Sequence, residues 1–427
     1  MELSHTFEER FVFTSKAKNK VFTLLGVGAL LFILGIVLLS SGFGSHAAEH
    51  GAAAGHGHAE AFDWTQRLYV NLWHNVVFFS GVAVMGIFFV SYNYVAYAGW
   101  SAGFLRIPMS FGAVLPYLGV IGLVVFFLGQ HHIFHWTHDG ITDPKSHHYD
   151  SIIAGKSAFL NVPFFLVRMV AYYTLWTLMY KLITKNSYDE DLNGTHTYWH
   201  KNTVVCAVFL LIFGVTSSTS AWDFVLSVDT HWFSTMFGWY VFASWHVSAL
   251  ATIALIIILL KERGYLANVN ENHIHDLGKM MFAFSIFWTY IWFSQFLLIF
   301  YANIPEETGY FIDRLRGFGY HYTGIFFLNL FINFVFPFLM LMTRDAKRSP
   351  IFVKIVAIAI IFGHWLDFYL MLNPGTTKGN SGFGPLEIGT ALLFLGLFIY
   401  VIADALSKHL LVPKNHPMLE ESLHHNI

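Results

Sequence analysis

Long apolar stretches alternate with short polar connections along almost the whole chain. A helix needs about 20 apolar residues to cross a bilayer, because each residue adds about 1.5 Å of length. Ten stretches reach that length: 21–43, 68–98, 111–135, 158–183, 202–221, 238–260, 279–302, 320–342, 351–372 and 387–409. The pattern predicts an all-α integral membrane protein with ten transmembrane helices. No internal repeat stands out along it.

The first apolar stretch is followed by Ala-rich sequence, which is a feature of secretory signal peptides. Its apolar run is too long for the core of a signal peptide, and a tail of about twenty residues precedes it. We therefore expect a retained helix. The chain then divides into an N-terminal tail (1–20), a first transmembrane helix (21–43), eight further helices, a tenth helix (387–409) and a C-terminal tail (410–427).

The composition supports a polytopic membrane protein. The chain is 56% hydrophobic and 12% charged, whereas soluble domains carry about 25% charged residues. A formal net charge of −2 gives no reason to expect nucleic-acid binding or a polybasic membrane patch. Cys206 is the single cysteine of the sequence, so disulfides, CxxC zinc sites, thiolate-held iron–sulfur clusters and CxxCH haem attachment are excluded within this chain.

The Lys and Arg residues predict the orientation, because cytoplasmic loops carry an excess of them. With the N-terminus inside, seventeen of the 24 fall in inner loops and tails, six fall in outer loops, and Arg168 lies within the fourth span. Both termini are therefore predicted to be cytoplasmic, and the connection 222–237 is predicted to face outward. A Gly-, Ala- and His-rich segment, 46–61, reads as a flexible outer loop whose histidines could bind adventitious metal.

The 24 histidines are unevenly distributed over this topology. His74, His246 and His364 fall in the outer halves of spans, His131, His132 and His135 close the outer end of the third, and Asp367 shares a helix face with His364 at i, i+3. The inner-side histidines are all predicted in loops or tails, so none is expected to be buried in the inner half of a span. A cytochrome b-like bundle would need paired histidines at two depths, and a haem–copper oxidase core would need several deep ligands. The sequence shows neither arrangement, which argues against both kinds of haem protein.

Buried ionisable groups in a membrane are costly and point to function. Histidine titrates near neutral pH, so imidazoles and carboxylates gathered in one leaflet suit proton movement to that face. The alternative is that His74, His246 and His364 only form hydrogen bonds between helices. We expect Arg168 to face the bundle interior and to meet a carboxylate, for which Asp367 is a plausible partner. Asn329 and Asn333 read first as interhelical hydrogen-bonding residues.

The connection between spans five and six has an unusual composition. Residues 220–234 read Ser-Ala-Trp-Asp-Phe-Val-Leu-Ser-Val-Asp-Thr-His-Trp-Phe-Ser and contain no Lys or Arg. Asp229 could cap the sixth helix, where an acidic charge is favourable. Capping does not explain why Asp223 and His231 accompany it. Two carboxylates and an imidazole between aromatic anchors suggest a proton-handling or partner-docking edge.

Residues 220–240 closely resemble the signature of the F subunit of alternative complex III, the bacterial quinol oxidoreductase that replaces the bc complex. Thr230 stands where family members often have proline. The resemblance extends over essentially the full length and places the chain near the NrfD- and PsrC-like membrane subunits. It implies two four-helix bundles, at about 68–221 and 238–372, flanked by the first and tenth helices, with 222–237 as an outer-face segment.

The resemblance also implies a division of labour within a complex of the bacterial inner membrane. This chain would hold no cofactor, while peripheral multihaem cytochrome c and iron–sulfur subunits would accept the electrons. A sister NrfD-like subunit would bind quinol, the substrate of the complex, and a terminal oxidase is a further partner to consider beside membrane lipid. The chain would conduct protons and dock the peripheral redox subunits of a complex that passes electrons from quinol to cytochrome c or another periplasmic acceptor. It would not be an enzyme by itself. A purely structural subunit and a stand-alone proton-coupled transporter stay open as alternatives.

Overall fold

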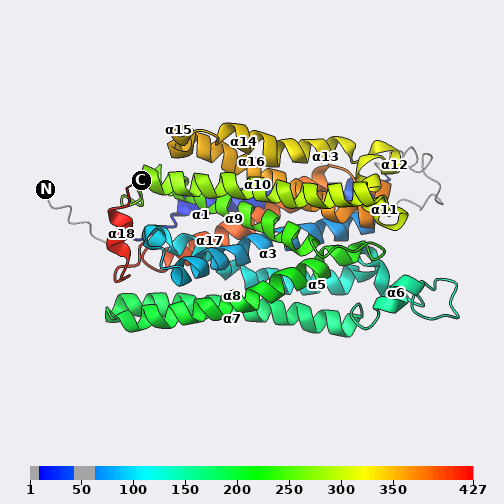
Figure 1. Ribbon diagram of the computed structural model, residues 1–427, viewed down its shortest axis with the longest axis horizontal. Helices are drawn as coiled ribbons and strands as arrows, with labels where there is room; N and C mark the ends of the chain where they lie inside the picture. The colour runs from blue at the N-terminus through cyan, green and yellow to red at the C-terminus, as the bar shows by residue number, and fades with distance from the viewer. Residues whose placement is uncertain (1–8, 43–62, 427) are drawn as a thin grey trace.

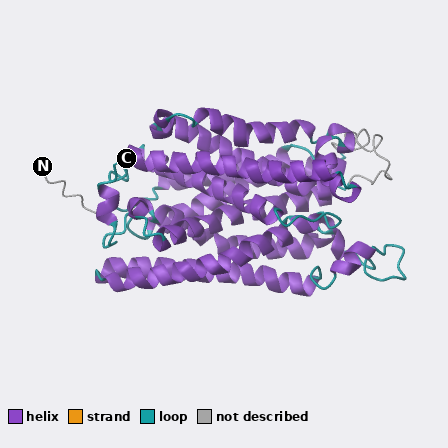
Figure 2. Ribbon diagram, viewed as in Figure 1, coloured by secondary structure: helices purple, strands orange, loops and turns teal. Residues whose placement is uncertain are grey.

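The computed structural model describes residues 9–42 and 63–426. Within these residues the chain is helical, without a β-strand, and ten helices are long and apolar enough to cross a membrane (Figure 2). The prediction of an all-α integral membrane protein with ten such helices is confirmed. The segment 46–61 lies outside the described residues.

The ten crossings are formed by the following elements. They are α1 (Ser15–Ser40), α3 (Trp64–Val95), α4 (Arg106–Ser110) with α5 (Leu115–Ile133), α7 (Val162–Asn193), α8 (His196–Phe224), α9 (Phe237–Lys261), α10 (Glu271–Ala302), α13 (Thr323–Leu330) with α14 (Phe336–Met340), α16 (Pro350–Thr376) and α17 (Pro385–Ser407). Short helices join them: α6 (Ser151–Lys156), α11 (Pro305–Leu315), α12 (Gly317–Tyr320), α15 (Arg344–Arg348) and α18 (Leu419–Leu423).

The helices form two bundles of four. In the first bundle α3, α5, α7 and α8 pack in a ring, and in the second α9, α10, the α13–α14 crossing and α16 do the same (Figure 1). Helix α3 also packs against α9 and α16, so it joins the two bundles. The predicted arrangement of two four-helix bundles flanked by two peripheral helices is confirmed.

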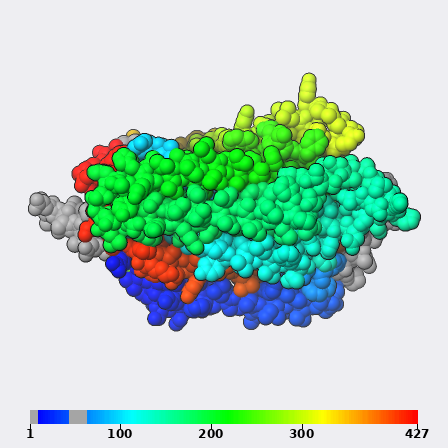
Figure 3. All heavy atoms as spheres, turned by 90° about the horizontal axis from the view of Figure 1, so that it is seen from below, coloured from blue at the N-terminus to red at the C-terminus, as the bar shows by residue number. Residues whose placement is uncertain are grey.

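The two peripheral helices, α1 and α17, lie against each other, and α17 lies against α3. Figure 3 shows α1 (blue) at one edge of the molecule with α17 (orange-red) beside it. Glycines permit this close approach, because a Cβ on Gly28 would lie 3.0 Å from the backbone nitrogen of Leu393. Small residues at helix contacts are typical of membrane proteins, where backbones pack closely without a hydrophobic driving force.

The described residues nearest the two termini meet at one end of the molecule, where Arg10 and Leu410 form an isolated β-bridge. We call this the terminal end; it carries α15, α18 and the connections 97–105 and 262–270. The opposite end, the loop end, carries α6, α11 and α12 and the connections 134–161, 225–236 and 377–384 (Figure 1). Ten crossings bring both termini to the same end.

Two connections at the terminal end are shorter than predicted. Helix α7 continues to Asn193 and α8 begins at His196, with Gly194 between them at φ 62°. At 32 residues, α7 and α10 are about 48 Å long, which exceeds the roughly 30 Å hydrocarbon core. The prediction that all inner-side histidines lie in loops or tails is therefore wrong. Apolar runs mark only the part of a helix that lies in lipid, and these helices extend beyond it.

His273 and His275 show the consequence. Both lie in the first turns of α10, and both are buried. His273 completes a capping box with Asn270 and contacts the hydroxyl of Ser422 at 3.1 Å. The expectation that no histidine is buried in the inner half of a membrane-crossing helix is also wrong.

Candidate functional site

Asp367 is the centre of a buried polar cluster in the second bundle. Its carboxylate accepts hydrogen bonds from Tyr240 (2.5 Å), Ser244 (2.7 Å), Trp288 (3.0 Å) and Asn329 (2.9 Å). These donors come from α9, α10 and α13, while Asp367 lies on α16, so all four crossings of the bundle contribute. The carboxylate is fully buried. We call Asp367, its four donors, His364 and Asn333 the Asp367 cluster.

Neutral donors hold this carboxylate without a bonded cation. An ionised carboxylate in an apolar interior is very unfavourable unless hydrogen bonds replace its hydration. Each hydrogen bond to a charged group contributes about 1.5–3 kcal/mol. Two donors on each carboxylate oxygen satisfy most of the acceptor capacity of Asp367. Neutral hydrogen-bond donors thus take the place of water around the buried carboxylate.

An irregular helix presents one of these donors. Residues Phe331–Val335 form a π-helical segment between α13 and α14, a feature often found at functional sites. Pro337 follows it and has no N–H to offer the carbonyl four residues earlier. The amide of Asn333 donates to Oδ1 of Asn329 at 2.6 Å, which turns the Asn329 amide nitrogen toward Asp367. The predicted interhelical role is confirmed for Asn329.

His364 lies one helical turn before Asp367. Its Nδ1 is 3.6 Å from Oδ2 of Asp367, and both ring nitrogens are buried without a hydrogen-bond partner among the described residues. The ring of Trp288 contacts it edge-on at 5.3 Å between centroids. An imidazole and a carboxylate this close can share one proton after a small side-chain rotation. The predicted i, i+3 pair therefore lies together in the bundle interior.

The Asp367 cluster connects toward the loop end. Tyr240, Gln295, Arg314 and Asn329 line a cavity that offers about 10 Å³ to the centre of a water molecule, which is about the minimum for one buried water. Gln295 in turn accepts a hydrogen bond at 3.4 Å from Ser234, which is partly exposed. Polar groups thus lead from the carboxylate to the surface at the loop end.

The path toward the terminal end is apolar. On α9, the hydroxyls of Ser248 and Thr252 donate to carbonyls of their own helix at 2.6 and 2.7 Å. Beyond them the interior of the bundle is filled by buried aliphatic side chains, which include Ile257, Leu277, Met281, Val353 and Val356. The cluster therefore has polar access on one side of the membrane.

Arg314 lies next to the cavity and was predicted only as an outer-loop charge. The side chain is buried and donates to the carbonyls of Tyr310 (2.7 Å), Leu370 (2.9 Å) and Met371 (3.2 Å). Pro374, four residues after Leu370, has no N–H, so the Leu370 carbonyl lacks its helical partner. Pro374 lies two residues beyond the predicted ninth span (351–372), and α16 continues through it to Thr376, so the need for an outside donor was not predicted from the sequence.

Arg168 pairs with Asp223, so the predicted partner, Asp367, is wrong. The guanidinium makes two parallel hydrogen bonds to the carboxylate, both at 2.8 Å, and Tyr172 donates a third at 2.8 Å. The rings of Phe159 and Phe164 cover the guanidinium at 3.9 and 4.2 Å. Helices α7 and α8 are neighbours in the first bundle, whereas Asp367 belongs to the second. Asp223 is fully buried and does not lie on a surface rim.

His74 and His246 lie outside the Asp367 cluster, between the bundles. Nε2 of His74 donates to the carbonyl of Trp365 at 2.8 Å, and so joins α3 to α16. His246 is enclosed by aromatic rings from three helices, among them Phe88 at 5.4 Å and Phe284 at 4.3 Å. These contacts favour a packing role for both histidines.

The remaining predicted residues gather in a surface pocket at the loop end. His131, His132, His135, Asp229 and His231 line a cavity of about 340 Å³ together with residues of 374–378. We call this the histidine pocket. Its walls come from the connections after α5, before α9 and after α16, so distant sequence segments form one polar concavity.

Carboxylates from elsewhere pair with two of these histidines. His231 contacts Asp150 at 2.6 Å, and His132 contacts Asp63 at 3.2 Å. Partial burial raises the pKa of Asp150, but the backbone N–H of Ile153 and the contact with His231 outweigh it and hold that pKa below its usual value. Burial, with His138 and His231 nearby, lowers the pKa of His135.

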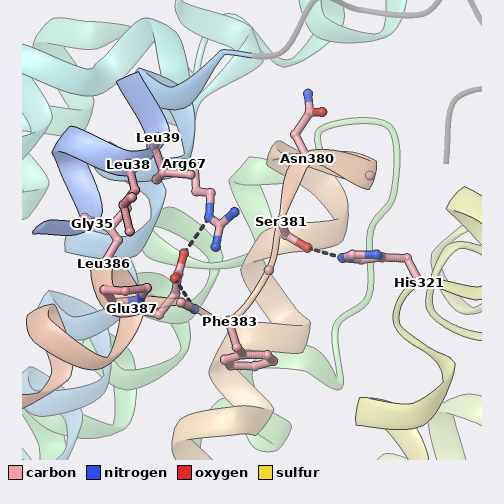
Figure 4. A pocket seen from close by; sticks show the side chains of 14 residues that line it. Gly35, Leu38, Leu39, Arg67, His321, Asn380, Ser381, Phe383, Leu386 and Glu387 are labelled. Carbon is pink, nitrogen blue, oxygen red and sulfur yellow. Dashed lines mark hydrogen bonds and ion pairs between the residues drawn. The ribbon is translucent and has the colours of Figure 1, made fainter. Parts of the chain in front are cut away.

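A second pocket at the loop end lies between α1, α17 and the connection before α17 (Figure 4). It measures about 270 Å³. Arg67 donates to Glu387 at 2.6 Å, and the backbone N–H of Gly384 donates to the other Glu387 oxygen at 2.7 Å. His321 and Ser381 meet across the opening at 2.9 Å. The ion pair fixes α17 against α3.

No protein-family model matches this chain, and a search of curated proteins finds no match either. Among the described residues, no three His, Cys, Asp or Glu side chains are placed to hold a metal ion.

Proposed function

We propose that this chain is a cofactor-free membrane subunit of a bacterial quinol oxidoreductase complex, and that it carries protons toward its loop end. The observation that carries the proposal is the Asp367 cluster, where a fully buried carboxylate and an unbonded imidazole lie 3.6 Å apart. The resemblance of residues 220–240 to the F subunit of alternative complex III supports the choice of complex.

The proton chemistry follows from the geometry. Oxidation of one quinol releases two electrons and two protons, so protons must leave the complex. When His364 is protonated, Nδ1–H can give its proton to Oδ2 of Asp367 once the Ser244 hydroxyl rotates away. The imidazole and the carboxyl group are then both neutral. Tyr240 bonds the carboxylate and also lines the cavity that leads to Gln295 and Ser234, so it links the shared proton to the loop end. An acid and a base that transfer protons must lie within hydrogen-bond reach or one water apart.

The electrons are assigned to partner subunits. In this proposal the sister NrfD-like subunit binds quinol, and peripheral iron–sulfur and haem c subunits pass electrons to cytochrome c or another acceptor. The histidine pocket is the proposed docking surface for the peripheral subunits. Its support is a polar concavity of about 340 Å³ on the face toward which the cluster opens. The excess of Lys and Arg toward the terminal end supports a cytoplasmic location of the termini in the inner membrane.

The test uses the assembled complex in sealed vesicles. Asp367→Asn and His364→Leu are each expected to lower quinol turnover and the linked proton release at least about tenfold, since a positioned acid or base typically contributes 10²–10⁴-fold. Ser248→Ala is the matched control, because its hydroxyl bonds only its own helix. Unchanged turnover and unchanged proton release in both variants would leave a purely structural subunit as the better account.

Purification in mild detergent separates the complex from the transporter alternative. A subunit of the proposed complex brings haem absorbance from its partners, whereas a transporter purifies alone. A haem-free, monomeric preparation that moves protons by itself would overturn the proposal.

A further inference from the structure

Six polar side chains converge at the terminal end of the first bundle, and none has an established role. Ser91 and Tyr94 lie one turn apart on α3, Ser187 and Glu190 one turn apart on α7, and Asn202 and Cys206 one turn apart on α8. All six are buried, with Glu190 at 1% and Asn202 at 0% exposure. Three neighbouring helices therefore turn polar faces toward each other.

Most of the polar atoms of this group have no hydrogen-bond partner. Both carboxyl oxygens of Glu190, both amide atoms of Asn202 and the hydroxyls of Tyr94, Ser91 and Ser187 are buried and unpartnered among the described residues. The Tyr94 hydroxyl lies close to the Asn202 amide without a regular hydrogen bond, and it interacts electrostatically with Glu190 and Cys206. Buried polar groups are almost always hydrogen-bonded, so such a concentration needs an explanation.

Arg106 is the cation near this group, and its guanidinium already has hydrogen-bond partners. Arg106 donates to Asp191 at 2.5 Å and to the carbonyls of Leu410 (2.8 Å) and Ser187 (3.2 Å). Its remaining Nε is buried without a partner. One guanidinium therefore faces two adjacent carboxylates, and its direct bond goes to Asp191. An ionised Glu190 would carry an uncompensated charge in the interior, which is among the costliest arrangements in a folded protein.

We propose that Glu190 is a proton-binding site, and that it carries its proton as a neutral carboxylic acid in the resting protein at neutral pH. The proton removes the charge and gives Glu190 one O–H donor, which the neighbouring Tyr94 hydroxyl can accept. This site is separate from the Asp367 cluster, since it lies in the other bundle and at the other end of the molecule. The proposal goes beyond the proposed function and does not depend on it.

The C-terminal tail lies against the site, and in this proposal His416 is the group through which the proton exchanges. Asn415 donates to the Glu190 carbonyl at 3.2 Å, and the ring of His416 packs edge-on against Tyr94 at 5.4 Å. Burial and the nearby Arg106 lower the pKa of His416 to about 4. Its imidazole is therefore neutral at neutral pH and can accept a proton transiently. The titratable and charged groups that interact with Glu190 are Asp191 on its own helix, Arg106 and Tyr94. Cys206 and His416 lie one step further away, beside Tyr94.

Infrared spectroscopy of the full-length protein in nanodiscs, with its partners where they copurify, tests the proposal. At neutral pH, Glu190→Gln is expected to remove the carbonyl stretching band of one protonated carboxylic acid from the wild-type spectrum. Asp189→Asn is the matched control, because Asp189 is a nearby carboxylate on the same helix whose side chain is partly exposed and does not pair with Arg106. An unchanged band in folded Glu190→Gln protein overturns the proposal.

Two further measurements keep the test decisive where Glu190→Gln does not fold. Asn202→Ala is expected to shift the band, because the acid then loses a neighbouring amide. His416→Phe is expected to slow the deuterium shift of the band in heavy water. A band that neither substitution changes does not arise from Glu190 and overturns the proposal.

Discussion

Asp223 and Asp367 each lie on the fourth crossing of a four-helix bundle, and a phenylalanine follows each of them directly. Asp223 is held by the bidentate guanidinium of Arg168 and by Tyr172. Asp367 is held by four neutral donors, with the unbonded His364 beside it. The charge of Asp223 is cancelled by a group that cannot lose its proton, whereas Asp367 depends on hydrogen bonds alone.

The comparison extends to the first crossing of each bundle. A Trp-His pair lies near the tenth position of both α3 (Trp73, His74) and α9 (Trp245, His246). Trp73 contacts Phe224 with ring centroids 5.7 Å apart, and Trp245 stacks on Phe368 at 6.0 Å. The bundles thus repeat one arrangement. In the first bundle the aspartate forms an ion pair with Arg168, and in the second it is held by neutral donors.

The largest expected loss of stability comes from breaking the ion pair between Arg168 and Asp223. Asp223→Asn leaves the buried Arg168 without its carboxylate, and removing one partner of a buried ion pair typically costs about 3–5 kcal/mol. Asp367→Asn is expected to destabilise less, since it leaves no buried cation without its counter-ion. Thermal unfolding in detergent with a common lipid content measures both. A double variant, Arg168→Leu with Asp223→Leu, is expected to recover part of the lost stability; equal losses for Asp223→Asn and Asp367→Asn would contradict the comparison.

A smaller effect is expected at Arg314. Arg314→Met removes three hydrogen bonds to carbonyls, of which that to Leu370 has no helical substitute, and a buried acceptor left unsatisfied costs about 1–3 kcal/mol. Pro374→Ala restores an N–H for Leu370. Pro374→Ala should therefore raise the stability of the Arg314→Met protein by more than it raises the stability of the wild type. Thermal unfolding of the four proteins gives the coupling, and strict additivity would argue against a link between Arg314 and Pro374.

Replacing Trp73 or Trp245 by phenylalanine should cause losses of stability that differ by about the value of one hydrogen bond. Nε1 of Trp73 donates to the carbonyl of Phe224 at 2.8 Å, while Nε1 of Trp245 is buried without a partner among the described residues. Trp73→Phe is expected to cost about 0.5–1.5 kcal/mol more than Trp245→Phe, the net value of a typical hydrogen bond. Denaturant unfolding of the two variants measures the difference. A larger loss for Trp245→Phe would show that its indole is bonded in the membrane.

The smallest expected effect on stability is that of mild acid, which acts on histidines at the loop end and not on Asp223 or Asp367. Burial lowers the pKa of His135 and of His321 in the folded protein. Between each lowered pKa and the usual value near 6.5, the unfolded chain binds more protons. Their contribution to stability is thus present above about pH 6.5 and declines as the pH falls through that window. A thermal unfolding series from pH 7.5 to 5 should show this decline, and His135→Gln should flatten it; an unchanged slope would remove His135 from the account.

The helix count and the His364–Asp367 pair could be predicted because both depend on local spacing. Hydropathy reports directly on the length of chain in lipid, since every backbone polar group there must be satisfied within its helix. The i, i+3 spacing places two side chains on one helix face whatever surrounds them. The polar extensions of α7, α8 and α10 carry no such signal, so the histidines at 196, 200, 273 and 275 were misplaced.

The sequence alone determined that Arg168 needed a carboxylate and that the charge could not be left in lipid. Only the tertiary structure decided that the carboxylate is Asp223, because the choice depends on which helices are neighbours and how each is rotated about its axis. The same holds for Tyr240, Ser244, Trp288 and Asn329, which come from three crossings and share no spacing along the chain. The cost of burying a charge is a property of the residue, whereas the groups that offset it are supplied by the packing of distant segments.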